Sequence, residues 1–176
     1  MVHYRRSRIA GGTYFLTVTL RNRRSILLAD HIDAPRSVFC STHRARPFTI
    51  DAIVVLPQHL HMIMTLPVDD ADYSGRISAI KSQFTRELVR RDVALLHNEK
   101  GEYDLWQRRF WEHTIRDDED FQRHVDYIHY RPVKHGQAEH VCDWPYSSFH
   151  RFVRMGLLSR DWAAASASVA KESFGE

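Results

Sequence analysis

Two histidines are the first residues of this chain whose types and spacing suggest chemistry. His59 and His61 flank Leu60 in an alternating segment that predicts a β-strand, and alternate side chains of a strand project from the same face. Two neighbouring imidazoles suit a divalent cation and leave coordination positions open for substrate and water, as a catalytic metal requires. The spacing also fits two surface histidines on a strand, because such short motifs arise by chance in a chain with 12 histidines.

Tyr127 is the candidate nucleophile. On a predicted helix, His124, Tyr127 and Arg131 share one face. We expect this face to be distinct from the apolar stripe of the same helix, so that the tyrosine hydroxyl meets an anionic substrate. An unperturbed tyrosine pKa of about 10 makes it a poor nucleophile unless a base, a cation or a metal assists. A tyrosine with a half-buried ring and no chemical role is the alternative. The apolar stripe consists of Phe121, Val125 and Ile128.

Aromatic and basic residues are mixed in the second half of the chain. Proteins that bind single strands combine basic grooves with aromatic platforms for unstacked bases. Large aromatics, however, usually belong to the core, and we expect most of them to be buried. The mixture includes the aromatic residues Trp106, Phe110, Trp111, Trp144, Tyr146 and Phe149 and the basic residues Arg108, Arg109, Lys134, Arg151 and Arg154.

Charge and composition narrow the function classes. The chain has 176 residues, 43% hydrophobic and 27% charged, with a net charge of only +3. The basic residues are clustered, since six arginines and no acid precede residue 25. Clustered basic residues predict a polyanionic partner or a solvated basic face. No apolar run approaches the roughly 18 residues that cross a bilayer, so no membrane contact is expected. Without a secretory signal, Cys40 and Cys142 are expected to be reduced and the protein cytoplasmic.

The elements that must position these residues follow from periodicity and from chain breakers. Mixed strands and helices predict an α+β domain, an antiparallel sheet with helices packed against it. We expect one domain over residues 1–176, with a C-terminal extension from about 141. The predicted strands cover residues 13–20, 48–56, 59–66 and 106–115. The predicted helices cover residues 29–43 with Pro35 in the first turn, 74–95, 117–129 ended by Pro132 and Gly136, and about 147–155.

Several motifs occur together in a specific order between Tyr4 and Trp162. They are Gly11-Gly12-Thr13-Tyr14-Phe15, Val54-Val55-Leu56-Pro57 leading into His59-Leu60-His61, Trp106-Gln107-Arg108-Arg109-Phe110-Trp111-Glu112-His113, Tyr127-Ile128-His129-Tyr130, Pro132-Val133-Lys134-His135-Gly136 and Asp143-Trp144-Pro145-Tyr146-Ser147-Ser148-Phe149. With these motifs the chain resembles the REP-associated tyrosine transposases. These are relatives of the single-strand insertion-sequence transposases in the HUH endonuclease superfamily.

The resemblance implies a ferredoxin-like α+β fold and a metal-dependent DNA strand transferase. It implies that His59 and His61 bind Mg²⁺ or Mn²⁺ and that Tyr127 attacks a phosphodiester of single-stranded DNA. The products would be a 5′-phosphotyrosine link and a free 3′-hydroxyl. The implied substrates are palindromic repeats folded as hairpins, bound by a monomer or a homodimer. The DNA-binding candidates are Arg5, Arg6, Arg108, Arg109, Arg131 and Lys134.

Two positions depart from the family pattern. Family members usually carry Asn, sometimes Gln, four residues after the tyrosine, and here that position is Arg131. A guanidinium stays protonated and cannot bind a cation, although it can clamp a phosphate. The residue before the first histidine is commonly Asp or Asn, and here it is Gln58. These departures leave the family assignment intact and bring cleavage into question.

Three functions remain open at this point. The first is an active single-strand transferase, and the second is a domesticated hairpin-DNA-binding protein with weak or lost catalysis, which Arg131 favours. The third is a metal-dependent hydrolase of small molecules. It would need further acidic or histidine ligands close in space, and it leaves the arginines and Tyr127 unexplained.

Overall fold

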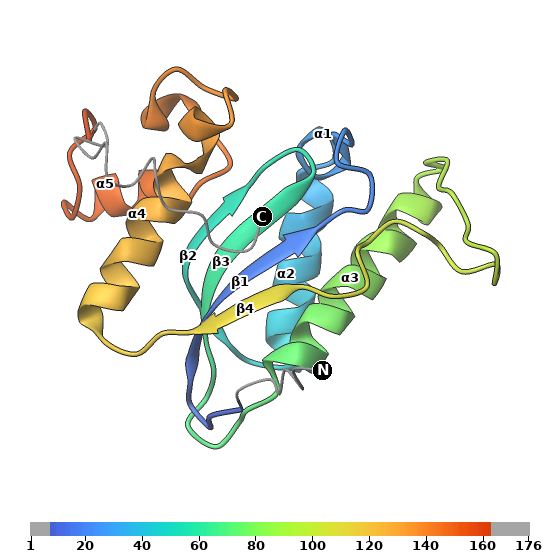
Figure 1. Cartoon of the computed structure of the whole chain (residues 1–176), viewed down its shortest axis with the longest axis horizontal. Helices are drawn as coiled ribbons and strands as arrows, with labels where there is room; N and C mark the ends of the chain where they lie inside the picture. Colours follow the sequence, from blue (N-terminus) through green and yellow to red (C-terminus); the bar gives the residue numbers. More distant parts are fainter. Residues whose placement is uncertain (1–7, 163–176) are drawn as a thin grey trace, which may run out of the picture.

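The computed structural model describes residues 8–162 and contains a four-stranded antiparallel sheet in the order β2-β3-β1-β4 (Figure 1). The central strands β1 and β3 pair along their full length, so Thr17 faces His61 and Thr19 faces His59 across the ladder. The strands are β1 (Thr13–Thr19), β2 (Thr49–Val55), β3 (His59–Thr65) and β4 (Trp111–Thr114).

Strands and helices follow each other along the chain in the order of a ferredoxin-like fold. This confirms the predicted α+β class. One helical crossover joins β1 to β2, another joins β3 to β4, and a further helix follows β4. None of the described helices has the length and apolar character to cross a membrane. The helices are α1 (Leu27–Asp30), α2 (Asp33–Ala45), α3 (Tyr73–Arg90), α4 (Asp118–Lys134), the 3₁₀ turn η1 (Val141–Asp143) and α5 (Phe149–Arg154).

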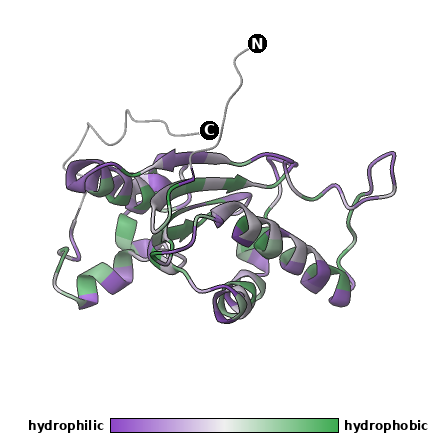
Figure 2. Ribbon diagram, turned by 90° about the horizontal axis from the view of Figure 1, so that it is seen from below, coloured by the Kyte–Doolittle hydropathy of each residue, from purple (hydrophilic) through white to green (hydrophobic). Residues whose placement is uncertain are grey.

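One face of the sheet carries the main apolar core. Alternate residues of β1 and β3 point to this face because side chains alternate along a strand. The crossover helices α2 and α3 lie together against it, and Figure 2 shows both on one side of the sheet. The buried residues here include Tyr14, Leu16, Val18, Leu60, Met62, Met64, Val38, Phe39, Ile77, Phe84 and Leu88.

The opposite face of the sheet is covered by α4, which packs against β2 and β3. Its core is smaller and contains polar groups among the apolar ones. His59, His61 and Thr17 are buried on this side of the central strands. The apolar members are Phe15, Ala52, Val54, Leu56, Ile63, Val125, Tyr127 and Ile128.

The predicted strand over residues 106–115 is shorter in the structure. Trp106 and Gln107 still pair with the end of β1, and the ladder resumes only at Trp111. Between these two points the chain leaves the sheet, which places Arg108 and Arg109 on the surface.

The helices differ from prediction mainly at their ends. The helix expected to end near residue 129 runs to Lys134, because Pro132 lies in its last turn and removes only one backbone donor. The helix expected over 74–95 ends at Arg90, since Asp92 adopts a φ of 56° that a right-handed helix cannot contain. The helix expected over 29–43 is divided into α1 and α2, with Pro35 in the first turn of α2 as predicted.

Candidate functional site

His59 and His61 lie side by side on the α4 face of β3. Their Nε2 atoms are 3.1 Å apart, and both side chains are buried. This confirms the prediction that the two imidazoles project from one face of one strand. It also removes the alternative of two surface histidines.

Burial sets the charge state of this pair. It is the largest cause that lowers the pKa of His59 to about 3 and that of His61 well below its usual range. Both rings are therefore neutral near pH 7. His61 Nδ1 lies 2.9 Å from Thr17 Oγ1, a contact that orients the ring so that Nε2 faces His59.

The donor set fits a divalent cation. Two nitrogens that each bind one ion at about 2.1 Å, at right angles, lie about 3 Å apart, close to the observed 3.1 Å. His59 Nδ1 is buried without a hydrogen-bond partner among residues 8–162. At this distance one Nε2–H can donate to the other Nε2, and a bound cation would take the place of that shared proton.

The Tyr127 ring packs against the ring of His61. The helix that carries it is capped by Asp117, whose side chain accepts from the backbone N–H of Asp120 at 2.8 Å. The Tyr127 ring centroid is 5.3 Å from that of His61 and 5.7 Å from that of Phe15. The expectation of a polar helix face distinct from the apolar stripe was wrong. Tyr127 is 0% exposed and belongs to the same cluster as Val125 and Ile128, because α4 presses both stripes against the sheet.

Arg131 lies against Tyr127, and His135 lies against His59. The Arg131 guanidinium carbon lies 4.6 Å from the Tyr127 ring centroid, and Nη2 is 2.5 Å from His135 Nε2. The His135 ring is in turn 5.1 Å from that of His59. Arg131 is fully buried, and burial lowers its pKa. The chain thus places a guanidinium against the candidate nucleophile.

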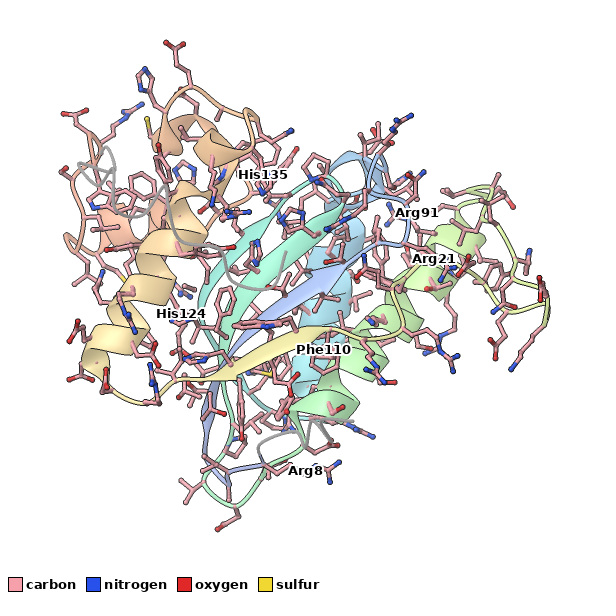
Figure 3. All side chains as sticks on the ribbon, viewed as in Figure 1. Arg8, Arg21, Arg91, Phe110, His124 and His135 are labelled. Carbon is pink, nitrogen blue, oxygen red and sulfur yellow. The ribbon has the colours of Figure 1, made fainter. Side chains whose placement is uncertain are left out.

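Sequence reasoning did not single out His135. Its position one helical turn after Arg131 is the signal that would have found it. Figure 3 labels His124 on α4 and His135 just after the end of this helix, with Tyr127 between them in the chain.

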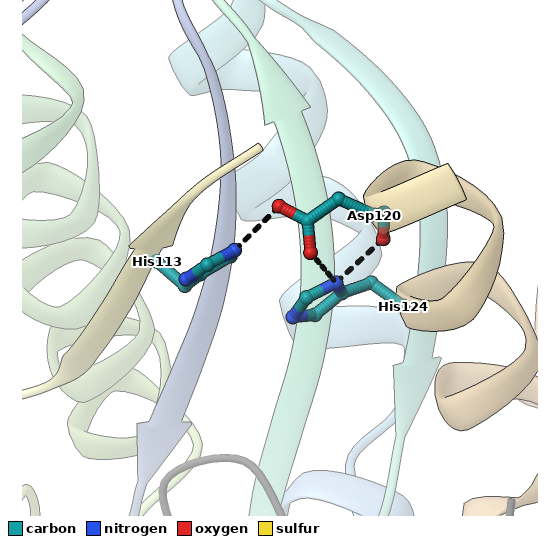
Figure 4. Close-up of side chains that lie close together, drawn as sticks. All are labelled: His113, Asp120 and His124. Carbon is teal, nitrogen blue, oxygen red and sulfur yellow. Dashed lines mark hydrogen bonds and ion pairs between the residues drawn. The ribbon is translucent and has the colours of Figure 1, made fainter. Parts of the chain in front are cut away.

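A second cluster gathers around one buried carboxylate at the start of α4. His113 Nε2 lies 2.7 Å from Asp120 Oδ2, and His124 Nδ1 lies 2.7 Å from the Asp120 carbonyl oxygen (Figure 4). The three side chains have the spacing of a metal site. Asp120, however, is also paired with Arg116 and Arg123, two cations that oppose a metal ion. We therefore read the cluster as the anchor that ties β4 to α4.

The predicted DNA-binding residues differ in exposure. Arg108 and Arg109 are exposed just before β4, and Lys134 is half-buried at the end of α4. Arg131 is buried beside Tyr127, as described above. The other two candidates, Arg5 and Arg6, lie outside the described residues.

Two further residues, Gln58 and Arg23, lie close to the histidine pair. Gln58 is half-buried, and its carbonyl accepts from the Leu20 N–H at 2.8 Å, which ties the turn before His59 to the end of β1. Arg23, an exposed residue that the sequence did not single out, follows in that adjacent turn. It is close enough to contribute, after burial, to the lowered pKa of His59 and of His135.

Residues 9–131 match the family model described as "Transposase IS200 like". The chain belongs to this family of DNA-processing enzymes. This confirms the resemblance stated from the motifs.

Individual relatives are similar over nearly their whole length. The REP-associated tyrosine transposase of Escherichia coli K12 is 49% identical over 163 residues, covering 93% of this chain and 92% of the relative. A relative from Haemophilus influenzae, assigned to the same group, is 47% identical over 164 residues, covering 92% and 93%. A solved REP-associated tyrosine transposase bound to a REP hairpin has a TM-score of 0.86 and 48% identity, and the match covers 100% of this chain and 98% of that one.

Proposed function

We propose that this transposase cuts and rejoins single-stranded DNA at hairpin-forming palindromic repeats, with Tyr127 as the nucleophile. The observation that carries the proposal is the position of the Tyr127 ring, 5.3 Å from the ring of His61 in the neutral histidine pair. The Tyr127 hydroxyl oxygen attacks phosphorus and loses its proton, and the bond from phosphorus to the 3′-oxygen breaks. The 3′-oxygen takes up a proton and leaves as a hydroxyl, which later reverses the step and rejoins the strand.

In this proposal His59 and His61 hold Mg²⁺ or Mn²⁺ through their Nε2 atoms. The bound ion would act as a Lewis acid on the scissile phosphate and offset the charge that develops there. Thr17 fixes the His61 ring, as its 2.9 Å contact with Nδ1 indicates. Because burial keeps both imidazoles neutral, no proton has to leave before they bind a cation.

Arg131 has two opposing effects in this arrangement. Its guanidinium lies over the Tyr127 ring, where a cation favours the phenolate that attacks phosphorus. The same fixed charge repels a divalent cation held by the neighbouring histidines. Arg131 is thus a positioning residue for the tyrosine, and it raises the metal concentration that the site needs.

The substrate assignment rests on the relatives and on the basic surface. A solved relative that is 48% identical binds a REP hairpin. In this chain the exposed Arg108 and Arg109, with Lys134 and Arg23 nearer the histidines, would contact the phosphates, together with Arg5 and Arg6. We further propose that residues 1–176 act as one DNA-processing unit, as a monomer or a homodimer.

The decisive experiment is a covalent-adduct assay. Purified protein is mixed with a labelled hairpin carrying a single-stranded foot, taken from the palindromic repeats of the source genome, with Mn²⁺ added. A protein–DNA adduct that survives denaturation is expected from the wild type. Tyr127→Phe should lose it by on the order of 10³-fold or more, because the ring and its packing remain while the nucleophilic oxygen is gone.

Tyr130→Phe is the matched control. Tyr130 lies one helical turn on and lines a different cavity of about 420 Å³, together with His140 and Trp162. An adduct that persists in Tyr127→Phe and disappears in Tyr130→Phe would transfer the nucleophile role to Tyr130. Hairpin binding without any adduct in the wild type would favour the second candidate, a domesticated hairpin-binding protein, and Arg131 is the feature that supports it.

A further inference from the structure

Six aromatic residues that lie among arginines and lysines in the second half of the chain occupy different environments. Trp106 and Phe110 pack against the α2/α3 core, and the Trp106 indole donates to Lys81 O at 3.1 Å. Trp144 and Tyr146 lie at the β2 edge, where the Trp144 indole donates to Val55 O at 2.9 Å. Phe149 is fully buried. Trp111 remains.

Trp111 lies on the same face of the sheet as Tyr127. It begins β4, the edge strand of the sheet, and packs against the α4-side cluster while half-buried. Its ring meets Phe15 edge-on, with centroids 5.6 Å apart. Phe15 also contacts Tyr127 at 5.7 Å and His61 at 5.6 Å. One ring therefore separates the indole from both the candidate nucleophile and the histidine pair.

The plane of the Trp111 indole is held by its neighbours. It is nearly parallel to the His113 ring, at 9° and 6.1 Å between centroids, and His113 is nearly parallel to His124, at 15° and 4.7 Å. His113 is itself fixed by its 2.7 Å contact with Asp120. The anchor at the start of α4 thus orients a row of three rings that runs from the sheet edge to the helix carrying Tyr127. A ring held in this way loses little conformational freedom when a ligand stacks on it.

The charge next to Trp111 indicates the kind of ligand. The chain leaves the sheet immediately before β4 and exposes Arg108 and Arg109 there. No acidic residue occupies positions 105–111, so two guanidinium groups precede a half-buried indole without a competing carboxylate in the segment. Guanidinium groups that bind phosphates beside an aromatic ring that stacks a base are the two components of a single-strand binding groove.

We propose that Trp111 stacks a nucleobase of the single strand next to the phosphodiester that Tyr127 attacks. This inference rests on the proposed function and adds a positioning residue to it. Stacking accepts any base because every base has a π-face, so Trp111 fixes the distance along the strand and leaves the choice of sequence to other contacts. Duplex DNA cannot use this site, because its bases are already stacked on each other.

The test measures binding of a hairpin with a single-stranded foot in the presence of EDTA, so that cleavage does not contribute. Trp111→Leu keeps the apolar bulk and loses the aromatic face, and we expect it to weaken binding roughly tenfold or more. Trp111→Phe should restore most of the affinity. Trp144→Leu is the matched control, since Trp144 is also half-buried and packs on the same cluster, but at the opposite edge of the sheet. It should bind as the wild type does.

A series of hairpins with one abasic position each then locates the contact. In the wild type we expect one abasic position in the foot to weaken binding, and in Trp111→Leu the same position should have no further effect. Equal affinity of wild type and Trp111→Leu, or the same abasic penalty in both, would overturn the inference.

The adduct assay above separates this outcome from failure of the proposed function. An adduct with no effect of Trp111→Leu on binding rejects the stacking role alone. Loss of affinity in Trp111→Leu without any wild-type adduct rejects the strand transfer alone.

Discussion

The two faces of the sheet are built from alternate residues of the same strands, yet they differ in character. On the α2/α3 face, Leu60, Met62 and Met64 of β3 join an apolar core. On the α4 face, the intervening positions of the same strand carry His59 and His61, buried beside Tyr127 and Arg131. Burying imidazoles and a guanidinium costs free energy that apolar residues would not, since polar groups lose water on burial. The α2/α3 face stabilises the fold, and the α4 face holds the reactive groups at a cost in folding free energy.

This difference can be tested at adjacent residues. Met62 is fully buried on the α2/α3 face. Met62→Ala should lower the free energy of unfolding by about 2–5 kcal/mol, through lost burial and the cavity it leaves. Chemical denaturation measures the loss, and the variant should keep its adduct yield per folded molecule. A change below about 1 kcal/mol would contradict the assignment of stability to this face.

The preceding residue, His61, gives the opposite expectation. Mn²⁺ at 100 times its Kd should stabilise the wild type by about 2.7 kcal/mol, because a ligand that binds only the folded state adds to its stability. His61→Ala should abolish this Mn²⁺-dependent rise in Tm, and Met62→Ala should retain it. A Mn²⁺ response that survives His61→Ala would place the metal elsewhere, and the cluster around Asp120 would be the first site to examine.

Burial of an imidazole carried by α4 itself also predicts a pH dependence. His129, buried against α5, has its pKa lowered to about 3, chiefly by burial, against about 6.5 in the unfolded chain. The unfolded state therefore binds more protons below pH 6.5, and stability present above that pH is lost as the pH falls towards 3. At pH 5 the loss from this residue is about 2 kcal/mol relative to pH 7.

His129→Gln should remove that part of the loss. The comparison is the change in unfolding free energy between pH 7 and pH 5 in the wild type and in the variant. His43→Gln, at an exposed position of α2, serves as the control. Identical pH dependence of wild type and His129→Gln would show that this ring is not held neutral by the fold.

The smallest effect concerns the charge beside the nucleophile. Arg131 contributes, after burial, to the lowered pKa of both His59 and His61, so its charge reaches the histidine pair. Arg131→Asn should lower the Kd for Mn²⁺ roughly tenfold, since a unit charge that close repels a cation by about 1–2 kcal/mol. Titration followed by electron paramagnetic resonance of Mn²⁺ measures the change, with Arg108→Asn as the control. An unchanged or higher Kd would mean that Arg131 does not oppose the metal.

Much of the architecture followed from local pattern. Period-2 alternation placed β1 and β3 and put His59 and His61 on one side, because a strand leaves its side chains no other choice. The order of strands and helices indicated the α+β class. The ends of α3 and α4 and the length of β4 were less predictable. They depend on a left-handed Asp92, on a proline tolerated in a last turn, and on a surface excursion at Arg108 and Arg109.

By itself, the sequence determined the family, the sheet and the pairing of the two histidines, since motif order and strand periodicity are local properties of the chain. The rotation of α4 over the sheet was decided only by the tertiary structure. Packing against β2 and β3 buries Tyr127 together with the apolar stripe, brings Arg131 onto its ring and joins His135 to the site. Helical periodicity gives the relative angles of these side chains and says nothing of which angle faces the sheet. That choice belongs to the packing of residues distant in the chain.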